Sequence, residues 1–346
     1  MEQKPLLLRS RFGERFANDV FHYIQEKYDG LFELGDVEIT AFPNKEILPK
    51  IGPNVRRRRV YLVHAFEGLG PVGSPYDNYD PNFGWMALYL INDAALRASA
   101  ERVTNVLPHI PYQRQDRKEE GRVPIGGKGV VKLLECAGGT SFERIVTVEM
   151  HSGQQAGFIE HPYDNLYTNR LFAGYLRSLG KDFAVVSPDP GGGNRARALA
   201  AMLGTHAVYS EKVKRGQEKI DVQIKGSLEG KIPVIIDDMV DSGSTLALTA
   251  RKLREGGEFG GGGPGAEEVY ACATHALLSP KDGRAEDRLR KLMKLVVTDT
   301  IPMSDAYRAS QEGWMTVLPV APLVGDALYQ IETAGSVSSL FTSPGT

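Results

Sequence analysis

The chain has 346 residues, of which 42% are hydrophobic and 24% charged, and its formal net charge is −2. These values are typical of a globular protein large enough for two domains, and they argue against a surface built for nucleic acid or for a membrane. No window approaches the roughly 18 apolar residues of a membrane span. Residues 1–11 lack the apolar core of a signal peptide, so we expect a cytoplasmic location.

Short apolar runs alternate with segments of helical periodicity along the chain. Strands are predicted at residues 37–42, 60–64, 103–110, 145–148, 183–187, 234–236, 269–273 and 295–298. Helices are predicted at residues 14–28, 85–100, 128–136, 171–179, 195–203, 247–254, 286–294 and 325–333. This alternation predicts an α/β protein with two mainly parallel sheets flanked by helices. We place the boundary near residues 162–167, which gives domains of residues 1–165 and 166–346.

The two cysteines, Cys136 and Cys272, lie far apart in the sequence among apolar or small residues. Two such thiols do not make a disulfide framework. We expect both to be reduced and buried in the core.

The most informative motif is the segment 234–245, which reads VIIDDMVDSGST. An apolar strand delivers Asp237 and Asp238, and a turn of small residues then opens a helix. The carboxylates can hold ribose hydroxyls, and backbone N–H groups at the helix start can hold a phosphate. An ordinary strand end with a helix cap is the alternative, but the pattern favours a sugar-phosphate site.

This segment resembles the phosphoribosyl-pyrophosphate (PRPP) loop of type I phosphoribosyltransferases, a family that includes both transferases and the kinase that makes PRPP. Residues 111–118, PYQRQDRK, are similar to the ATP-site region of that kinase, ribose-phosphate pyrophosphokinase. Arginine, glutamine and lysine just after a strand suit polyphosphate and adenine contacts. Taken alone, such a run would fit a solvated charged loop equally well.

Two further segments resemble the metal region of the same kinase. In residues 148–158, VEMHSGQQAGF, His151 takes the place of a histidine that helps bind the magnesium of Mg-ATP. In residues 185–197, VVSPDPGGGNRAR, Asp189 lies at the carboxyl edge of a strand, where open α/β sheets bind ligands. Without the resemblance, a histidine in this place is more often structural. Because magnesium prefers oxygen ligands, the histidine would be a partial or water-mediated ligand.

The segment 211–219, EKVKRGQEK, is similar to a flexible catalytic loop whose K-x-R pair closes on the transferred phosphates. Lys212 matches the lysine, while Lys214 falls on the arginine position with Arg215 next to it. Lysine and arginine are not equivalent at a bidentate phosphate site. Either Lys214 acts as a point charge or Arg215 takes the arginine's role. The residues alone would favour a solvated basic loop.

Residues 41–47, AFPNKEI, stand where the family typically shows FSDGE. Phe42 and Glu46 match this pattern, and the resemblance implies that Phe42 stacks on adenine, often across a subunit interface. Asn44 replaces the aspartate and Lys45 replaces the glycine. Ser244 likewise stands where the family often has glycine.

The resemblance implies two tandem phosphoribosyltransferase-like domains, magnesium as cofactor, and a homo-oligomer built from dimers that can stack into hexamers. The implied reaction moves diphosphate from Mg-ATP to the anomeric hydroxyl of ribose 5-phosphate, giving PRPP and AMP. The implied site residues are Asp237, Asp238, Asp241, Ser242, Gly243, Ser244 and Thr245 for ribose phosphate; Phe42, Asn44, Glu46, Arg114, Gln115, Asp116, Arg117 and Lys118 for ATP; His151 and Asp189 for metal; and Lys212, Lys214 and Arg215 for catalysis.

Three alternatives stay open at this point. The acceptor could be a larger ribose 5-phosphate derivative such as ADP-ribose. A nucleobase phosphoribosyltransferase would need the segment at 237–245 but not the ATP cluster, so residues 111–118 argue against it. A catalytically silent regulatory homologue that binds a true synthetase is favoured by Asn44 and Lys214, whereas His151, Asp189 and Lys212 argue against it.

Overall fold

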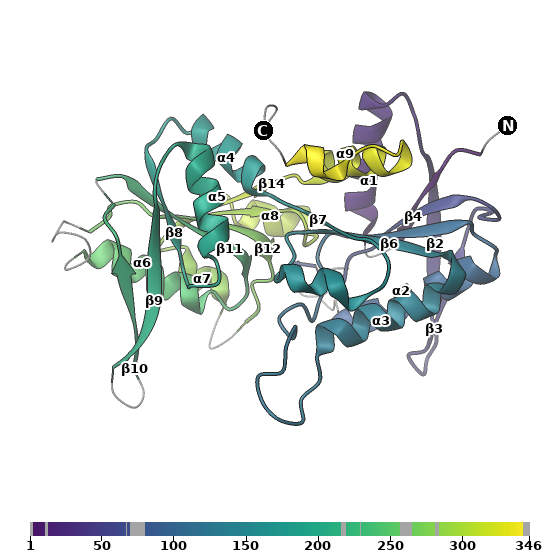
Figure 1. Ribbon diagram of the computed structural model, residues 1–346, viewed down its shortest axis with the longest axis horizontal. Coiled ribbons are helices and arrows are strands. Elements are labelled where there is room, and N and C mark those ends of the chain that lie inside the picture. The colour runs from purple at the N-terminus through teal and green to yellow at the C-terminus, as the bar shows by residue number, and fades with distance from the viewer. Residues whose placement is uncertain are drawn as a thin grey trace. The chain divides into compact units, whose positions relative to one another are not determined.

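The computed structural model describes residues 3–10, 13–66, 68–69, 80–215, 219–228, 230–256, 265–280 and 284–341, without the side chains of residues 212–221. The described chain forms two compact units, each with a seven-stranded sheet (Figure 1). Unit 1 comprises Met1–Leu166, Thr300–Tyr307 and Pro319–Thr346, and unit 2 comprises Tyr167–Asp299 and Arg308–Leu318. The predicted α/β fold class is therefore confirmed.

The sheet of unit 1 has the strand order β3-β2-β1-β4-β5-β6-β7. Its strands are β1 (Leu6–Ser10), β2 (Glu33–Ala41), β3 (Ile47–Ile51), β4 (Arg59–Val63), β5 (Arg102–Leu107), β6 (Phe142–Val148) and β7 (Tyr163–Leu166). Neighbours are parallel except for the β2–β3 hairpin. Figure 1 shows helices α1 (Glu14–Lys27) and α9 (Ala321–Glu332) on one side of this sheet, with α2 (Pro81–Arg97) and α3 (Gly126–Gly138) on the other. Apolar strands covered on both faces are what parallel sheets require.

Helix α9, near the end of the chain, is fastened to α1. The Asp326 carboxylate accepts hydrogen bonds from the hydroxyls of Tyr23 (2.7 Å) and Tyr28 (2.8 Å) and from Lys27 Nζ (2.9 Å). The rings of Tyr28 and Tyr329 stack with centroids 3.8 Å apart. These contacts place α9 in the first compact unit. The predicted division instead assigned all of residues 166–346 to one domain. The predicted domain boundary near residues 162–167 stays a prediction.

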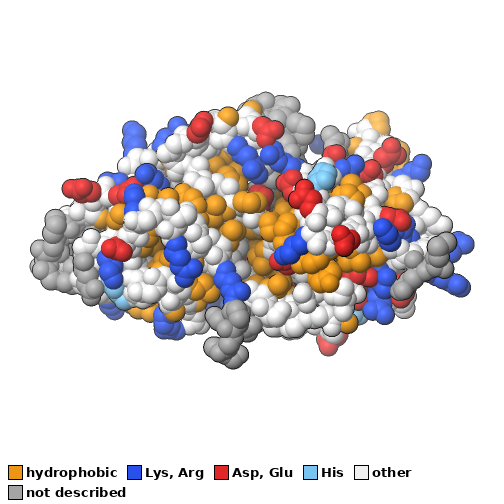
Figure 2. All heavy atoms as spheres, turned by 90° about the horizontal axis from the view of Figure 1, so that it is seen from above, with side chains coloured by type: hydrophobic (Ala, Val, Ile, Leu, Met, Phe, Trp, Pro, Cys, Tyr) orange, Lys and Arg blue, Asp and Glu red, His pale blue; other side chains and the backbone are white. Residues whose placement is uncertain are grey.

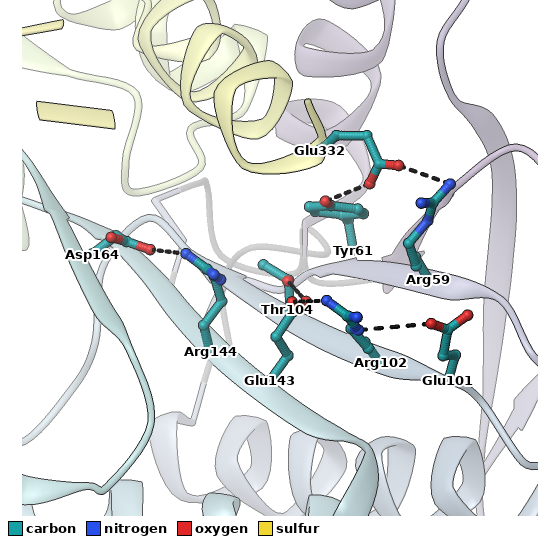
Figure 3. A network of polar contacts seen from close by, with 9 residues as sticks. All are labelled: Arg59, Tyr61, Glu101, Arg102, Thr104, Glu143, Arg144, Asp164 and Glu332. Carbon is teal, nitrogen blue, oxygen red and sulfur yellow. Dashed lines mark hydrogen bonds and ion pairs between the residues drawn. The ribbon is translucent and has the colours of Figure 1, made fainter. Parts of the chain in front are cut away.

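A second polar network ties the last residue of α9 to the same sheet (Figure 3). Glu332, whose side chain is 5% exposed, pairs with Arg59 (2.9 Å) and accepts a hydrogen bond from the Tyr61 hydroxyl (2.7 Å). Burial, together with the neighbouring carboxylate, raises the pKa of Tyr61. Ion pairs and hydrogen bonds continue across β5, β6 and β7 through Arg102, Thr104, Glu143, Arg144 and Asp164.

The sheet of unit 2 has the order β10-β9-β8-β11-β12-β13-β14, and only the β9–β10 pair is antiparallel. Its strands are β8 (Phe183–Ser187), β9 (Ala207–Arg215), β10 (Lys219–Lys225), β11 (Ile232–Val240), β12 (Tyr270–Ala276), β13 (Lys294–Thr298) and β14 (Met315–Leu318). The helices are α4 (Asn169–Ser178), α5 (Gly193–Leu203), α6 (Ser244–Glu255) and α7 (Ala285–Leu289), and α8 spans Asp305–Ser310. Buried side chains such as Phe172, Val185 and Ile236 form part of its core.

Every predicted strand and helix overlaps an observed element, but some predicted bounds are wrong. The helix predicted at residues 286–294 ends at Leu289, and Lys294 instead begins β13; the strand predicted at residues 103–110 ends at Leu107. The sequence prediction lacked β1, β3, β7, β9, β10, β14 and α8. The most consequential difference concerns the predicted catalytic loop, because Lys212, Lys214 and Arg215 lie on β9 while residues 216–218 fall outside the described chain. A charged run can form a strand when its backbone pairs with a neighbouring strand of a hairpin.

The prediction that both cysteines are buried is half wrong. Cys272 on β12 is fully buried, and burial raises the pKa of its thiol. Cys136 is exposed. It lies on α3, whose buried positions include Val131, Leu134 and Gly138, and the 100° turn per residue directs position 136 away from that face.

The surface agrees with the near-neutral charge of the chain. Figure 2 shows acidic and basic side chains interspersed over one face of the molecule. No helix within the described ranges is long and apolar enough to cross a membrane.

Candidate active site

The paired carboxylates lie at the carboxyl end of β11, which runs between β8 and β12 in the second sheet. Asp237 Oδ1 accepts a hydrogen bond from the backbone N–H of Asp238 (2.9 Å). Burial, followed by the charge of Asp238, raises the pKa of Asp237 well above its ordinary value. Arg195 opposes this shift and Asp189 adds to it. Arg195, whose positive charge lowers the pKa of Asp237, was not among the predicted site residues.

The turn after β11 leads into α6 through a glycine, which contributes no side-chain cap. Asp241 is half-buried in the turn, and Gly243 precedes the helix with φ 71°, a left-handed conformation that glycine adopts at little cost. Gly243 has no side chain with which to cap the first turn, which includes Thr245. The hydroxyls of Ser242 and Ser244 lie 3.1 Å apart beside it. The N–H groups at a helix start are suited to an anion, as predicted for the 5-phosphate.

Asp189 lies in the corresponding turn after β8. Its Oδ1 accepts a hydrogen bond from the backbone N–H of Gly192 (3.0 Å), and its carbonyl oxygen accepts one from the Ser187 hydroxyl (2.6 Å). Strands β8 and β11 are parallel neighbours, so both turns leave the same edge of the sheet. The structure thus brings Asp189 to the edge that carries Asp237 and Asp238, which is where open α/β sheets bind ligands.

The β9–β10 ribbon starts from the same edge. Tyr209 of β9 is the register partner of Ser187, the last residue of β8, and β9 continues to Arg215. Beyond Tyr209 its pairing partner is β10, with Lys212 opposite Val222. At about 3.3 Å per residue, Lys212 lies roughly 10 Å along the strand past the end of β8. Figure 1 shows this pair extending as a two-stranded ribbon.

A magnesium ion bound with ATP is compatible with these carboxylates. The described part of the chain contains no cluster of three or more His, Cys, Asp or Glu side chains that would cage a metal. Magnesium commonly uses only one or two protein carboxylates and takes its remaining ligands from substrate phosphates and water. Burial first and the charge of Asp238 second raise the pKa of Asp237, and a cation bound nearby would oppose this rise.

The predicted ATP cluster forms a turn in unit 1, after β5. The backbone N–H of Gln115 donates to the carbonyl of Tyr112 (2.9 Å), and that of Gly127, in α3, donates to the Gln115 carbonyl (3.1 Å). Arg117 pairs only loosely with Glu119 (3.6 Å). The turn is thus anchored by its backbone, with exposed side chains at Arg114, Gln115, Arg117 and Lys118 and a half-buried one at Asp116.

Sequence reasoning missed Gln113, which joins two predicted parts of the site. Its side chain is 2% exposed, and its Oε1 accepts a hydrogen bond from the backbone N–H of His151 (2.8 Å). Its carbonyl accepts a second hydrogen bond from Gln155 Nε2 (2.6 Å). The predicted ATP turn and the exposed His151 are therefore held together through Gln113. A polar residue inside a charged run gives no signal of burial in the sequence.

The Phe42 corner is the tip of the β2–β3 hairpin. The backbone N–H of Phe42 donates to the Glu46 carbonyl (2.8 Å), and that of Glu46 donates to Asn44 Oδ1 (3.2 Å). Lys45 takes a left-handed conformation with φ 70°. Phe42 is 44% exposed, so it is not a core residue and remains available for stacking. The strand order places β1 and β4 between this hairpin and the strand that leads to the ATP turn.

Comparisons with known proteins decide the family. Residues 9–138 match the N-terminal domain of ribose phosphate pyrophosphokinase, and residues 189–342 match the phosphoribosyl synthetase-associated domain. The chain is 38% identical over 314 residues to a ribose-phosphate pyrophosphokinase of Listeria ivanovii, which covers 89% of this chain and 90% of the relative. The chain belongs to the ribose-phosphate pyrophosphokinase family.

Other members agree with this assignment. The chloroplastic ribose-phosphate pyrophosphokinase 2 of Arabidopsis thaliana is 36% identical over 321 residues, covering 91% of this chain and 73% of the relative. The crystal structure of phosphoribosylpyrophosphate synthetase from Mycobacterium smegmatis superimposes with a TM-score of 0.79 at 30% identity, covering 96% of this chain and 100% of the other. The predicted family is confirmed, while the roles of individual site residues stay predictions.

Proposed function

We propose that this chain transfers diphosphate from ATP to the anomeric hydroxyl of ribose 5-phosphate, forming PRPP and AMP. The observation that carries this proposal is the acidic pair Asp237 and Asp238 at the end of β11, followed by the glycine-led start of α6, in a member of the ribose-phosphate pyrophosphokinase family. That arrangement offers acceptors for ribose hydroxyls beside donors for a phosphate.

The reaction needs positioning and charge stabilisation more than covalent chemistry. The anomeric oxygen attacks the β-phosphorus in line. The bond from that phosphorus to the oxygen bridging it to the α-phosphate breaks, AMP leaves, and the hydroxyl proton passes to solvent. Asp237 and Asp238 would orient the sugar, and the first turn of α6 would hold its 5-phosphate. Lys212, with Lys214 or Arg215, would stabilise charge on the transferred group from the β9–β10 ribbon.

We assign Mg-ATP as the form of the nucleotide that binds. Asp189 and His151 are the residues proposed to face its metal, which would neutralise charge on the phosphoryl oxygens. Phe42, Asn44 and Glu46 at the hairpin tip would contact the nucleotide, alongside the exposed turn of residues 114–118. Since β1 and β4 separate the hairpin from that turn, we propose that a second copy of the chain supplies Phe42, in a homo-oligomer built from dimers. A cytoplasmic location is proposed with it.

The alternatives are not favoured. A nucleobase phosphoribosyltransferase does not need the ATP turn that Gln113 anchors to the His151 segment. No specific contact favours ADP-ribose as acceptor over ribose 5-phosphate. A silent regulatory homologue would have no need for Asp189 beside the acidic pair, and Asn44 preserves the hairpin turn through its hydrogen bond to Glu46.

The test is an incubation of the full-length protein with Mg-ATP and either ribose 5-phosphate or ADP-ribose, with the nucleotide and sugar products resolved by mass spectrometry. AMP and PRPP formed with ribose 5-phosphate would support the proposal. AMP formed only with ADP-ribose would replace the acceptor, and folded protein that forms no AMP with either would favour the regulatory alternative. Omitting magnesium tests the assignment of Mg-ATP, because activity should then be lost.

A further inference from the structure

The ribose-phosphate turn is braced by a neighbouring helix that no motif identified. We propose that Arg288 of α7 is a positioning residue for ribose 5-phosphate, acting through the backbone of Ser242 and Gly243. This inference rests on the proposed role of that turn as the 5-phosphate site. It adds a residue 46 positions from Ser242 in the sequence that would decide how well the turn binds its ligand.

The contact is specific in its geometry. Nη1 of the Arg288 guanidinium donates a hydrogen bond to the carbonyl oxygen of Ser242. That carbonyl and the N–H of Gly243 belong to one planar peptide unit and point in opposite directions. Holding the carbonyl toward α7 therefore directs the Gly243 N–H to the opposite side, away from Arg288.

The next peptide unit is fixed independently. The carbonyl of Gly243 accepts the first hydrogen bond of α6, from the backbone N–H of Ala247 (2.9 Å). This sets the direction of the Ser244 N–H, which shares that peptide plane. Two consecutive backbone donors at the helix start are thus oriented, one by Arg288 and one by α6 itself. Consecutive oriented N–H groups of this kind form an anion-binding concavity.

Leu289, next to Arg288, keeps the two elements in register. Its side chain is fully buried, and its Cδ1 would lie 2.8 Å from a Cβ atom built on Gly243. Such close approach leaves the turn little freedom to shift relative to α7. Without the Arg288 hydrogen bond, the Ser242–Gly243 peptide plane should therefore be free to rotate, while Leu289 still packs the turn against α7.

An arginine suits this role because its guanidinium stays charged at every relevant pH and presents donors in a rigid plane. Hydrogen bonds from charged donors are roughly twice as strong as neutral ones. The positive charge also lies beside the turn that would receive a dianionic phosphate. A lysine would retain the charge and one donor, whereas a methionine would retain only the apolar stem.

The experiment compares Arg288→Met, Arg288→Lys and the control Arg290→Met. Arg290 follows α7 directly but contacts Gln311 (3.0 Å) and the Trp314 ring, outside the proposed site. The Kd for ribose 5-phosphate is measured by calorimetry, the KM for both substrates by steady-state kinetics, and the Tm by calorimetric melting. We expect Arg288→Met to raise the Kd and KM for ribose 5-phosphate about tenfold to a hundredfold while the KM for ATP changes by less than about twofold.

The expected pattern includes partial rescue, with Arg288→Lys lying between the native protein and Arg288→Met, and a fall in Tm no larger than that of Arg290→Met. Equal rises in both KM values, or a lysine variant no better than the methionine variant, would overturn the positioning role. If native protein binds ribose 5-phosphate but forms no AMP, the proposed reaction fails and the Kd series still decides the role of Arg288. Native protein that does not bind ribose 5-phosphate would overturn both.

Discussion

Substituting Gly243 by alanine should destabilise the fold and weaken ribose 5-phosphate binding, for two separable reasons. The residue has φ 71°, where a side chain is strained by its own backbone. A Cβ atom there would also lie 2.8, 3.0 and 3.2 Å from Cδ1, Cγ and Cδ2 of Leu289. These separations are shorter than the 3.5–4.0 Å or so of ordinary carbon contacts. Leu289 is fully buried, so it has little room to retreat.

The expected cost follows from these two contributions. A left-handed conformation costs an L-residue about 1–2 kcal/mol, and overpacking a core position costs about 1–3 kcal/mol. Gly243→Ala should therefore lower the free energy of unfolding by about 2–5 kcal/mol. Gly204, which ends α5 with φ 67° and would place its Cβ in open space, is the matched control. Gly204→Ala should cost only the backbone contribution of about 1–2 kcal/mol.

Urea unfolding of the two variants measures the difference, and the KM for ribose 5-phosphate reports its effect on the turn. The double variant Gly243→Ala/Leu289→Ala should cost less than the sum of its single variants, because removing the leucine side chain relieves the clash. Equal unfolding costs for Gly243→Ala and Gly204→Ala would refute the steric reasoning. Strict additivity in the double variant would refute it independently.

Four other outcomes are expected. Lys45→Gly should stabilise the protein by about 1 kcal/mol in urea unfolding, since glycine adopts φ 70° without strain. Asp326→Ala should cost about 2 kcal/mol or more, because three donors lose their acceptor; Asp93→Ala, which breaks an exposed i,i+4 pair, is the control and should cost about 0.5 kcal/mol or less. Asp237→Asn should abolish turnover and become progressively more stable than the native protein as pH rises. The raised pKa of Asp237 gives the native fold stability below its ordinary value of 3.8, and this is lost as pH rises through the raised value. Lys212→Ala should lower kcat far more than it raises the KM for ATP, as measured by steady-state AMP formation.

Each of these expectations has an outcome that contradicts it. An unchanged unfolding midpoint in Lys45→Gly would mean that the hairpin turn carries no backbone strain. Equal costs for Asp326→Ala and Asp93→Ala would show that the carboxylate does not fasten α9 to α1. If the difference in unfolding free energy between native protein and Asp237→Asn stayed constant across about pH 4–8, the pKa of Asp237 would not be raised in the native protein. A normal turnover rate in Lys212→Ala would exclude the β9–β10 ribbon from the mechanism.

Much of the geometry of the proposed ribose-phosphate site could be predicted from the sequence because its parts are adjacent in the chain. The strand, the acidic pair and the small-residue turn occupy residues 234–245, and the structure places them at the end of β11 and the start of α6. Asp189 was predicted for a similar reason, because it lies between the end of a strand and a run of three glycines a few residues on. That these two turns share one edge depends on the parallel pairing of β8 with β11, which no local pattern specifies.

Other features depended on contacts between distant segments. The periodicity of α9 predicted a helix, but it did not predict that Asp326 would accept hydrogen bonds from α1. The charged residues of segment 211–219 gave no sign of a strand, although β9 pairs there with β10. The burial of Gln113 and the exposure of Cys136 likewise follow from what surrounds them.

The sequence by itself determined the alternating α/β elements and the family motifs, and it predicted a ribose phosphate as the ligand of the β11 turn. Those features follow from the periodicity and the types of residues that are close together in the sequence, so they can be read from short segments of the chain. Tertiary structure alone decided that Gln113 joins the ATP turn to His151 and that Arg288 reaches the carbonyl of Ser242. Hydrogen bonds between residues 38 or 46 positions apart exist only after the sheets have formed, because strand order brings their partners together.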